Sequence, residues 1–245
     1  MDVMFNLFKG LLPPLANAKK LKKAVLTYNL FTGSIPANFG AIPSLTSLSL
    51  DINFLTGSLP VSFSNTYLSY LSVSENQLTG YLPQSLLALP SLAYLNLRKN
   101  AFIGTLPTSI STMSAIQVLD ISFNKFIGTL PTGLGSLKYL NTLNVSVNDF
   151  QGQVPAELCT IGSLQYLDTY NNPKLECYAS CIDSMQKISK KDMGVPKCPD
   201  PVPSATPTAY PTAAQRVSVS YAVDHSLIGI SISEFQKDYD ANVKV

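Results

Sequence analysis

The chain has 245 residues, of which 46% are apolar and 13% are charged, and its formal net charge at pH 7 is +2. A balance this close to neutral argues against nucleic acid or an anionic membrane as the partner. The apolar content is enough for a hydrophobic core. The sequence has no run of about 18 apolar residues from which a membrane-spanning helix could form.

The beginning of the chain looks like a secretory leader, because it is mostly apolar and residues 16–18 read Ala-Asn-Ala. Asp2, however, lies where such a leader carries positive charge. Asn6, Gly10 and Pro13 are also spaced as in a motif that recurs along the chain. We therefore expect the chain to begin inside a repeat, with any export signal encoded upstream.

Residues 1–176 consist of a repeated motif, of which the stretch from Leu92 to Pro107 is the clearest copy. In this copy leucines at spacings of three and two are followed by an asparagine, then a glycine four residues later and a proline three residues after that. The asparagines recur every 23 or 24 residues, at Asn6, Asn29, Asn53, Asn76, Asn100, Asn124, Asn148 and Asn172. A fixed period of this length predicts the stacked coils of a solenoid.

Each column of this motif has a physical reason. The leucines alternate along a short strand, so that stacked coils form a parallel sheet with strands about 4.8 Å apart. The asparagine amide can bond to the turning backbone of its own coil and of the neighbouring coil, and glycine allows a tight bend with positive φ. Proline suits the start of a helical turn. Apolar residues three and six positions after the proline predict short helices or 3₁₀ turns opposite the sheet.

The motif resembles the plant-type leucine-rich repeat, with the consensus LxxLxxLxLxxNxLxGxIPxxLGxL. Plant receptor ectodomains, pectinase inhibitors and kinetoplastid surface antigens are similar. The antigens favour Gly-x-Leu-Pro, and four copies of this sequence occur here, which end at Pro60, Pro83, Pro107 and Pro131. The resemblance implies an α/β solenoid with a parallel sheet on its concave face and short helical or 3₁₀ segments on its convex face. It also implies recognition of a protein, peptide or glycan ligand.

Four cysteines, Cys159, Cys177, Cys181 and Cys198, lie at the C-terminal end of the array. The segment around them resembles the cysteine-containing caps of extracellular leucine-rich repeat proteins, and an even number at a cap predicts two disulfides and an extracellular or cell-surface location. Three connectivities are possible. Because Cys159 and Cys181 are 22 residues apart, close to one period, we predict Cys159–Cys181 and Cys177–Cys198. A zinc site is the weaker alternative, since the close paired spacing of zinc ribbons is absent.

Beyond the array we divide the chain into a cap at residues 177–198, a Pro/Ser/Thr-rich linker at residues 199–214 and a tail at residues 215–245. The linker composition is typical of an extended segment suited to O-glycosylation. Alternating apolar residues from Val217 to Val223 resemble a strand. Because about thirty residues rarely form a core alone, we interpret the tail as the start of an incomplete second domain.

The residues between the strand leucines are expected to lie on the concave surface, where exposed tyrosine and arginine are typical recognition anchors. The predicted ligand-binding patch consists of Tyr70, Tyr94, Asn96, Arg98, Asp120, Tyr166 and Asp168. The sequon at Asn144 lies on the same face, and a glycan there would restrict binding to the half of the groove around Tyr70 and Arg98. The alternative is that these positions hold neutral surface residues, and that the chain is a surface-coat or wall spacer without a specific ligand.

The sequence offers little for catalysis, and we predict a non-enzymatic protein without a cofactor or metal. Its one histidine, His225, lies outside the repeats, so we expect no nucleophile–base pair in the groove. Asp120 and Asp168 occupy the same column two coils apart, about 10 Å by strand spacing. That is wider than expected of an inverting glycosidase pair, and we interpret both as polar surface positions.

Overall fold

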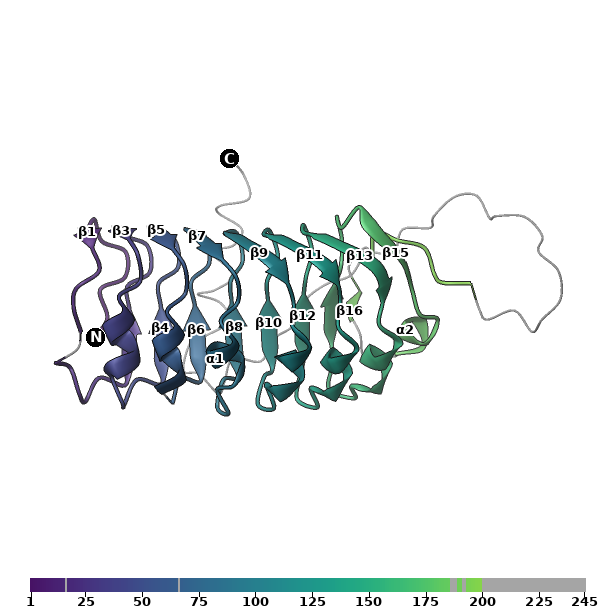
Figure 1. Cartoon of the computed structure of the whole chain (residues 1–245), viewed down its shortest axis with the longest axis horizontal. Helices are drawn as coiled ribbons and strands as arrows, with labels where there is room; N and C mark the ends of the chain where they lie inside the picture. Colours follow the sequence, from purple (N-terminus) through teal and green to yellow (C-terminus); the bar gives the residue numbers. More distant parts are fainter. Residues whose placement is uncertain (16, 66, 186–188, 191–192, 200–245) are drawn as a thin grey trace.

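The computed structural model describes residues 1–15, 17–65, 67–185, 189–190 and 193–199 of the chain. They form a solenoid in which each repeat contributes one coil, and the coils follow one another from the N-terminus to the cysteine segment (Figure 1). The predicted second domain, and all of the predicted linker except Pro199, lie outside the described residues.

The strands that carry the leucine pattern form one parallel sheet, which we call the leucine sheet. Its eight strands are β2 (Lys23–Val25), β4 (Ser47–Ser49), β6 (Tyr70–Ser72), β8 (Tyr94–Asn96), β10 (Val118–Asp120), β12 (Thr142–Asn144), β14 (Tyr166–Asp168) and β16 (Ser189–Lys190). Neighbouring strands pair in register, so that Leu71 lies beside Leu95 and Leu95 beside Leu119. Equivalent positions of successive coils therefore form columns along the solenoid. This is the concave-face sheet that the repeat predicts.

A second parallel sheet, which the sequence analysis did not predict, contains the glycine of each repeat, and we call it the glycine sheet. Its eight strands are β1 (Lys9–Leu11), β3 (Leu30–Gly33), β5 (Phe54–Gly57), β7 (Gln77–Gly80), β9 (Ala101–Thr105), β11 (Lys125–Thr129), β13 (Asp149–Val154) and β15 (Lys174–Tyr178). The glycines have positive φ, for example +76° at Gly33 and +86° at Gly104. This conformation was predicted, but its consequence is a paired strand and not a simple bend.

Short helical turns complete most coils on the convex side, as predicted. They are the 3₁₀ turns η1 (Ala37–Ala41), η2 (Val61–Asn65), η3 (Thr108–Thr112), η4 (Thr132–Ser136) and η5 (Ala156–Thr160), and the α-helices α1 (Gln84–Leu87) and α2 (Cys181–Ser184). Proline directly precedes η1, and Pro36 has a φ of −63°, close to the angle that its ring imposes. The lack of an N–H on proline costs nothing there, because the first amides of a helical turn have no intrahelical acceptor.

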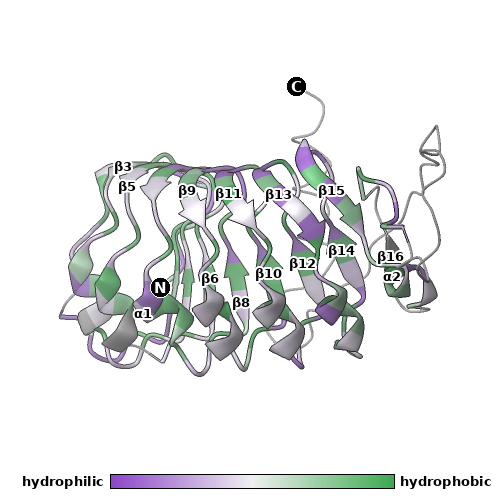
Figure 2. Cartoon of the chain, turned by 45° about the vertical axis from the view of Figure 1, so that its right-hand side comes forward, coloured by the Kyte–Doolittle hydropathy of each residue, from purple (hydrophilic) through white to green (hydrophobic). Residues whose placement is uncertain are grey.

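A single apolar core runs through the solenoid between the two sheets and the helical turns. Figure 2 shows that hydrophobic residues recur in successive coils. Phe102, Phe126 and Phe150 form a stack in this core, with ring centroids 6.3 and 6.2 Å apart. Each coil contacts mainly its neighbours, which is typical of repeat proteins.

The asparagine column forms a hydrogen-bond ladder. Asn53 Nδ2 donates to the carbonyl oxygens of Leu26, Leu50 and Asp51 at 3.0–3.1 Å, and its Oδ1 accepts from the Phe31 amide at 3.0 Å. Equivalent bonds are made by Asn29, Asn76, Asn100, Asn124, Asn148 and Asn172. Each of these side chains therefore joins its own coil to the preceding one.

The residue before each ladder asparagine has a left-handed backbone, which the sequence analysis also did not predict. Ile52, Lys99 and Val147 have φ values of 53°, 51° and 53°. Non-glycine residues rarely adopt this conformation, and it is least favourable for a β-branched side chain. The chain passes here from the leucine sheet to the glycine sheet, and the asparagine side chain bonds to backbone groups at this turn, as Asn53 does to the carbonyl oxygens of Leu50 and Asp51.

The cysteine segment packs on the last coil of the array. Disulfides join Cys159 to Cys181 and Cys177 to Cys198, the two pairs that the spacing predicts. Within this end of the solenoid, Thr169 Oγ1 donates to the carbonyl oxygen of Met193 at 2.8 Å. No helix among the described residues is both long enough and apolar enough to cross a membrane.

Candidate functional site

The side chains between the strand leucines form one continuous surface on the leucine sheet. The register places Tyr70 beside Tyr94 and Asn96 beside Asp120. Asp120 lies beside Asn144, and Asn144 lies beside Asp168. The residues of the predicted patch therefore come from β6, β8, β10 and β14 and, for Arg98, from the turn after β8; Asn144 on β12 lies between the β10 and β14 members.

The Tyr70 and Tyr94 rings stack, with 4.4 Å between their centroids and 11° between their planes. These residues are only 8% and 7% exposed, although exposed anchors were expected at these positions. Burial raises the pKa of both phenols above the ordinary value of 10.0. The pair is therefore a fixed, uncharged part of the surface.

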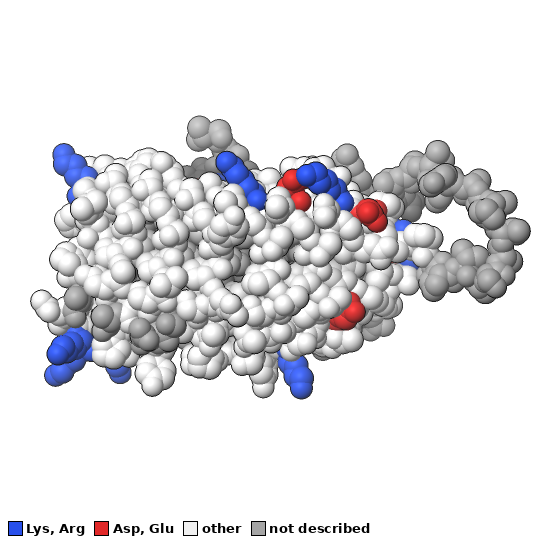
Figure 3. Space-filling view, in the orientation of Figure 1, with Lys and Arg blue, Asp and Glu red and all other residues white. Residues whose placement is uncertain are grey.

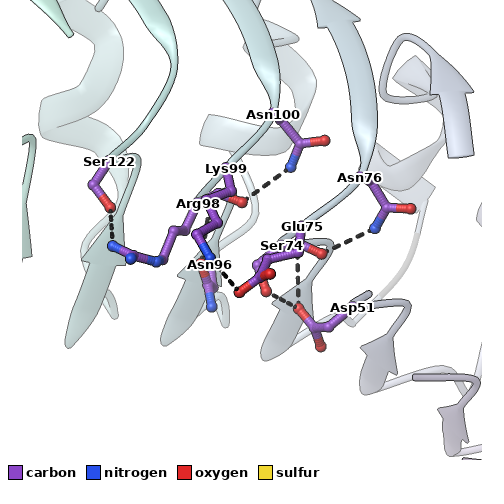
Figure 4. Close-up of polar contacts among 9 residues, drawn as sticks. All are labelled: Asp51, Ser74, Glu75, Asn76, Asn96, Arg98, Lys99, Asn100 and Ser122. Atoms are coloured by element: carbon purple, nitrogen blue, oxygen red, sulfur yellow. Dashed lines mark hydrogen bonds and ion pairs between the residues drawn. The ribbon is translucent and has the colours of Figure 1, made fainter. Parts of the chain in front are cut away.

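Asp51 collects four hydrogen bonds from two coils next to this stack, and it was not among the predicted site residues. Its carboxylate accepts from the Ser49 hydroxyl at 2.7 Å and from the Ser72 hydroxyl. It also accepts from the Ser74 amide at 2.8 Å and the Ser74 hydroxyl at 2.6 Å (Figure 4). The available sequence signal was a carboxylate followed one coil later by a serine in the same column, Ser74, and a serine in the adjacent column, Ser72.

An amide or carboxylate at the end of each strand from β8 to β14 caps the next turn of backbone. In each case a side-chain oxygen accepts the amide N–H two residues later, at 2.9–3.1 Å. The residues that accept these bonds are Asn96, Asp120, Asn144 and Asp168. These side chains consequently have a structural role as well as a place on the candidate surface.

Arg98 and Asp120 are the charged groups at the centre of the patch. Arg98 Nη1 donates to Ser122 Oγ at 3.1 Å (Figure 4). Its guanidinium carbon lies 4.2 Å from the centroid of the Phe123 ring. Burial raises the pKa of Asp120, while hydrogen bonds from Ser122 and the charge of Arg98 oppose this effect. The serine hydroxyl thus links the two charged side chains, since it also donates to Asp120 at 2.6 Å.

The C-terminal part of the patch contains a tyrosine–carboxylate contact. The Tyr166 hydroxyl donates to Asp168 Oδ2 at 3.1 Å, and both residues are buried. Two strands separate this contact from Arg98. The predicted residues therefore form two groups on one sheet, one around Tyr70, Tyr94 and Arg98 and the other around Tyr166.

Asn144 lies between these groups and is 4% exposed. Its Oδ1 accepts from the Ser146 hydroxyl at 2.7 Å, and its Nδ2 is 3.4 Å from Asp120 Oδ2. The two residues that define the glycosylation sequon are thus bonded to each other inside the sheet.

The described residues contain no group of three or more His, Cys, Asp and Glu side chains arranged to hold a metal ion. Asp120 and Asp168 lie two strands apart, as the repeat predicts. What this surface can do chemically is present hydrogen-bond donors and acceptors, a stacked aromatic pair and a few charges on a rigid sheet.

Family models for leucine-rich repeats match residues 43–102 and residues 115–137. The leucine-rich repeat receptor protein kinase MSP1 of Oryza sativa subsp. japonica is 50% identical over 52 residues, which are 20% of this chain and 4% of the kinase. The matched segment thus spans a small part of this curated relative.

Solved plant receptor structures have the same fold. The plant peptide hormone receptor RGFR1 in complex with RGF2 superposes with a TM-score of 0.72 at 28% identity, over 76% of this chain and 30% of that one. The Arabidopsis receptor kinase HAESA in complex with the peptide hormone IDA and the co-receptor SERK1 superposes with a TM-score of 0.71 at 30% identity, over 78% of this chain and 33% of that one.

Proposed function

The repeats of this chain are leucine-rich repeats, and from this premise we propose that the chain is an extracellular recognition module that binds a protein or peptide on its leucine sheet. The observation that carries the proposal is the continuous surface from Tyr70 to Asp168 on a sheet whose strands are held in register. An extended peptide laid along this sheet meets a new side chain at every strand, about 4.8 Å apart.

The rigidity of the surface favours binding. Tyr70, Tyr94 and Asp51 are each held by contacts within the sheet, so a ligand does not have to immobilise them, and the entropic cost of association is lower. Arg98 and Asp120 supply opposite charges for orienting a ligand. Arg98 is partly exposed, and arginine is among the residue types most often found at the energetic centre of interfaces.

The proposed location is the cell surface or the extracellular space. Two disulfides at the end of the array support it, because such bonds persist in oxidising compartments. The similar solved structures include a plant peptide hormone receptor and a receptor kinase in complex with the peptide hormone IDA, and these support a peptide as the class of ligand.

A random-peptide display library selected against the full chain tests this proposal. Synthetic versions of the enriched peptides are then titrated against the wild-type chain, Arg98→Ala and Lys125→Ala. Lys125 is exposed on the glycine sheet and provides the matched control for removal of a cation. We expect Arg98→Ala to weaken binding about tenfold or more, with Lys125→Ala unchanged.

Two outcomes would contradict the proposal. Selection that enriches no peptide would favour the surface-coat or wall spacer as the function. Enriched peptides that respond to Lys125→Ala and not to Arg98→Ala would place binding on the glycine sheet.

A further inference from the structure

The outer face of the glycine sheet has an uncharged surface that the proposed function does not use. Three outward columns cross β3, β5, β7 and β9, at positions one, three and five after each ladder asparagine. Their members are Leu30, Thr32, Ser34, Phe54, Thr56, Ser58, Gln77, Thr79, Tyr81, Ala101, Ile103 and Thr105. None of them is charged, and all except the partly buried Ala101 are exposed. Figure 3 shows the long uncharged areas of the molecule in this view.

Tyr81 is the prominent side chain of this surface, and it is 69% exposed. Its ring is seated against Gly104 of the next coil. A Cβ added to Gly104 would lie 2.4 Å from Tyr81 Cδ1 and 2.6 Å from Cε1. The glycine column therefore has a second role besides its positive φ, because the missing side chain makes room for the ring edge.

The neighbours of Tyr81 leave its ring accessible. Ser58 and Thr105, which flank it in the same column, are too small to cover an aromatic ring. Thr79 Oγ1 lies 3.4 Å from the Gly57 carbonyl oxygen and remains exposed. An oriented aromatic ring is thus surrounded by small hydroxyl-bearing side chains.

This combination matches the chemistry of a sugar polymer. A pyranose ring has C–H groups on its faces, which pack on an aromatic ring, and hydroxyl groups at its rim, which bond to Ser, Thr and Gln side chains. A surface that binds a protein usually has a compact cluster of large residues at its centre. Here the two large aromatic residues, Phe54 and Tyr81, lie in different columns on different coils, which does not fit that pattern.

The regular spacing of the coils favours a linear ligand. Because β3, β5, β7 and β9 pair in parallel, hydroxyl groups recur along the solenoid about every 4.8 Å. We propose that this face, centred on Tyr81, binds an uncharged linear polysaccharide. In these four coils the three columns contain no charged group, so they offer none of the ionic contacts on which recognition of an acidic polymer depends; the nearest charges in the same columns are Lys9 on β1 and Lys125 on β11.

Co-sedimentation of the purified full chain with microcrystalline cellulose and with insoluble β-1,3-glucan tests the inference. The variants are Tyr81→Ala, Tyr81→Phe and, as a matched control, Tyr139→Ala, which removes another exposed tyrosine (65% exposed) outside this face. We expect the wild-type chain to sediment with at least one polymer. Tyr81→Ala should weaken that binding about tenfold, while Tyr81→Phe and Tyr139→Ala should retain it.

The inference is overturned if the wild-type chain remains in solution with both polymers, or if Tyr81→Ala and Tyr139→Ala lower binding equally. The face could instead bind a second copy of the chain, and sedimentation velocity of the same proteins tests this alternative. A wild-type dimer that dissociates in Tyr81→Ala would assign the face to self-association. Arg98→Ala should not change polysaccharide binding, which keeps this result separate from peptide binding on the leucine sheet.

Discussion

The phenol rings of Tyr70 and Tyr94 stack across the β6–β8 pair with their centroids 4.4 Å apart. The two residues are 24 positions apart in the sequence, one repeat, and only the in-register stacking of the coils brings them together. Their contact makes the N-terminal end of the candidate surface rigid, and it makes the stability of the solenoid sensitive to either ring.

Tyr94→Ala should lower the free energy of unfolding by about 2–4 kcal/mol, because it removes a buried aromatic side chain and its stacking contact with Tyr70. Tyr94→Phe keeps the ring and should cost less than about 1 kcal/mol. Urea unfolding followed by circular dichroism measures both values. Equal losses in the two variants would show that the hydroxyl, and not the ring, stabilises this position.

The same pair predicts a loss of stability at alkaline pH. Burial raises the pKa of Tyr70 and Tyr94 above 10.0, so above this pH the unfolded chain releases phenolic protons that the folded chain retains. Stability is therefore complete below about pH 10 and falls as the pH rises toward the folded-state pKa values.

Urea unfolding between pH 8 and pH 11 measures this dependence. The double variant Tyr70→Phe/Tyr94→Phe has no phenol at either position and should show a shallower decline than the wild-type chain. The exposed Tyr139→Phe provides the control, and a slope that changes only in this control would rule out the buried pair as the cause.

Asn100→Ala should be costly because the Asn100 side chain joins two coils. Its Nδ2 donates to the carbonyl oxygens of Val73, Leu97 and Arg98, and its Oδ1 accepts from the Leu78 amide. We expect the free energy of unfolding to fall by about 3 kcal/mol. Asn96→Ala removes a single acceptor for the Arg98 amide and should cost about 1 kcal/mol by the same denaturation assay. A smaller effect for Asn100 than for Asn96 would contradict the ladder as a source of stability.

Val147→Asn should stabilise the solenoid by about 0.5–1 kcal/mol. Val147 is a β-branched residue with a φ of 53°, and asparagine tolerates this conformation better than valine. Thermal unfolding should show a higher Tm for Val147→Asn, with no rise for Val147→Ala, which retains the unfavourable backbone. A lower Tm for the asparagine variant would mean that valine packing outweighs backbone strain at this site.

The sequon at Asn144 should remain unmodified in correctly folded protein. Asn144 is 4% exposed, and its amide is bonded to Ser146 and Asp120, so the sheet has no room for a glycan there. Chain secreted from a eukaryotic host should therefore have the same peptide mass at this site before and after glycosidase treatment. A glycan on folded protein would show that β12 is displaced. Asn144→Gln is the control for glycosylation elsewhere.

The repeat and the disulfide pairs could be predicted because the residues that define them recur at fixed positions within the 23- to 24-residue period. The positions of Gly104 and Pro107 require backbone conformations that few other residue types adopt. Cys159 and Cys181 are separated by nearly one coil. The candidate surface could be predicted as a face, because side chains alternate along a strand. The roles of its members could not, since Tyr94 as an exposed anchor and Tyr94 as a buried stacking partner have the same sequence pattern.

By itself, the sequence determined the period, the concave leucine sheet, the helical turns after proline and the position of the cysteine segment. Only the tertiary structure decided that the glycine segments pair as a second sheet, that Asp51 gathers serines from two coils, and that Tyr81 is seated against Gly104. The physical reason is that the first set depends on the conformational preference of single residues within one coil. The second set depends on contacts between residues 21 to 24 positions apart, which exist only once the coils have stacked in register.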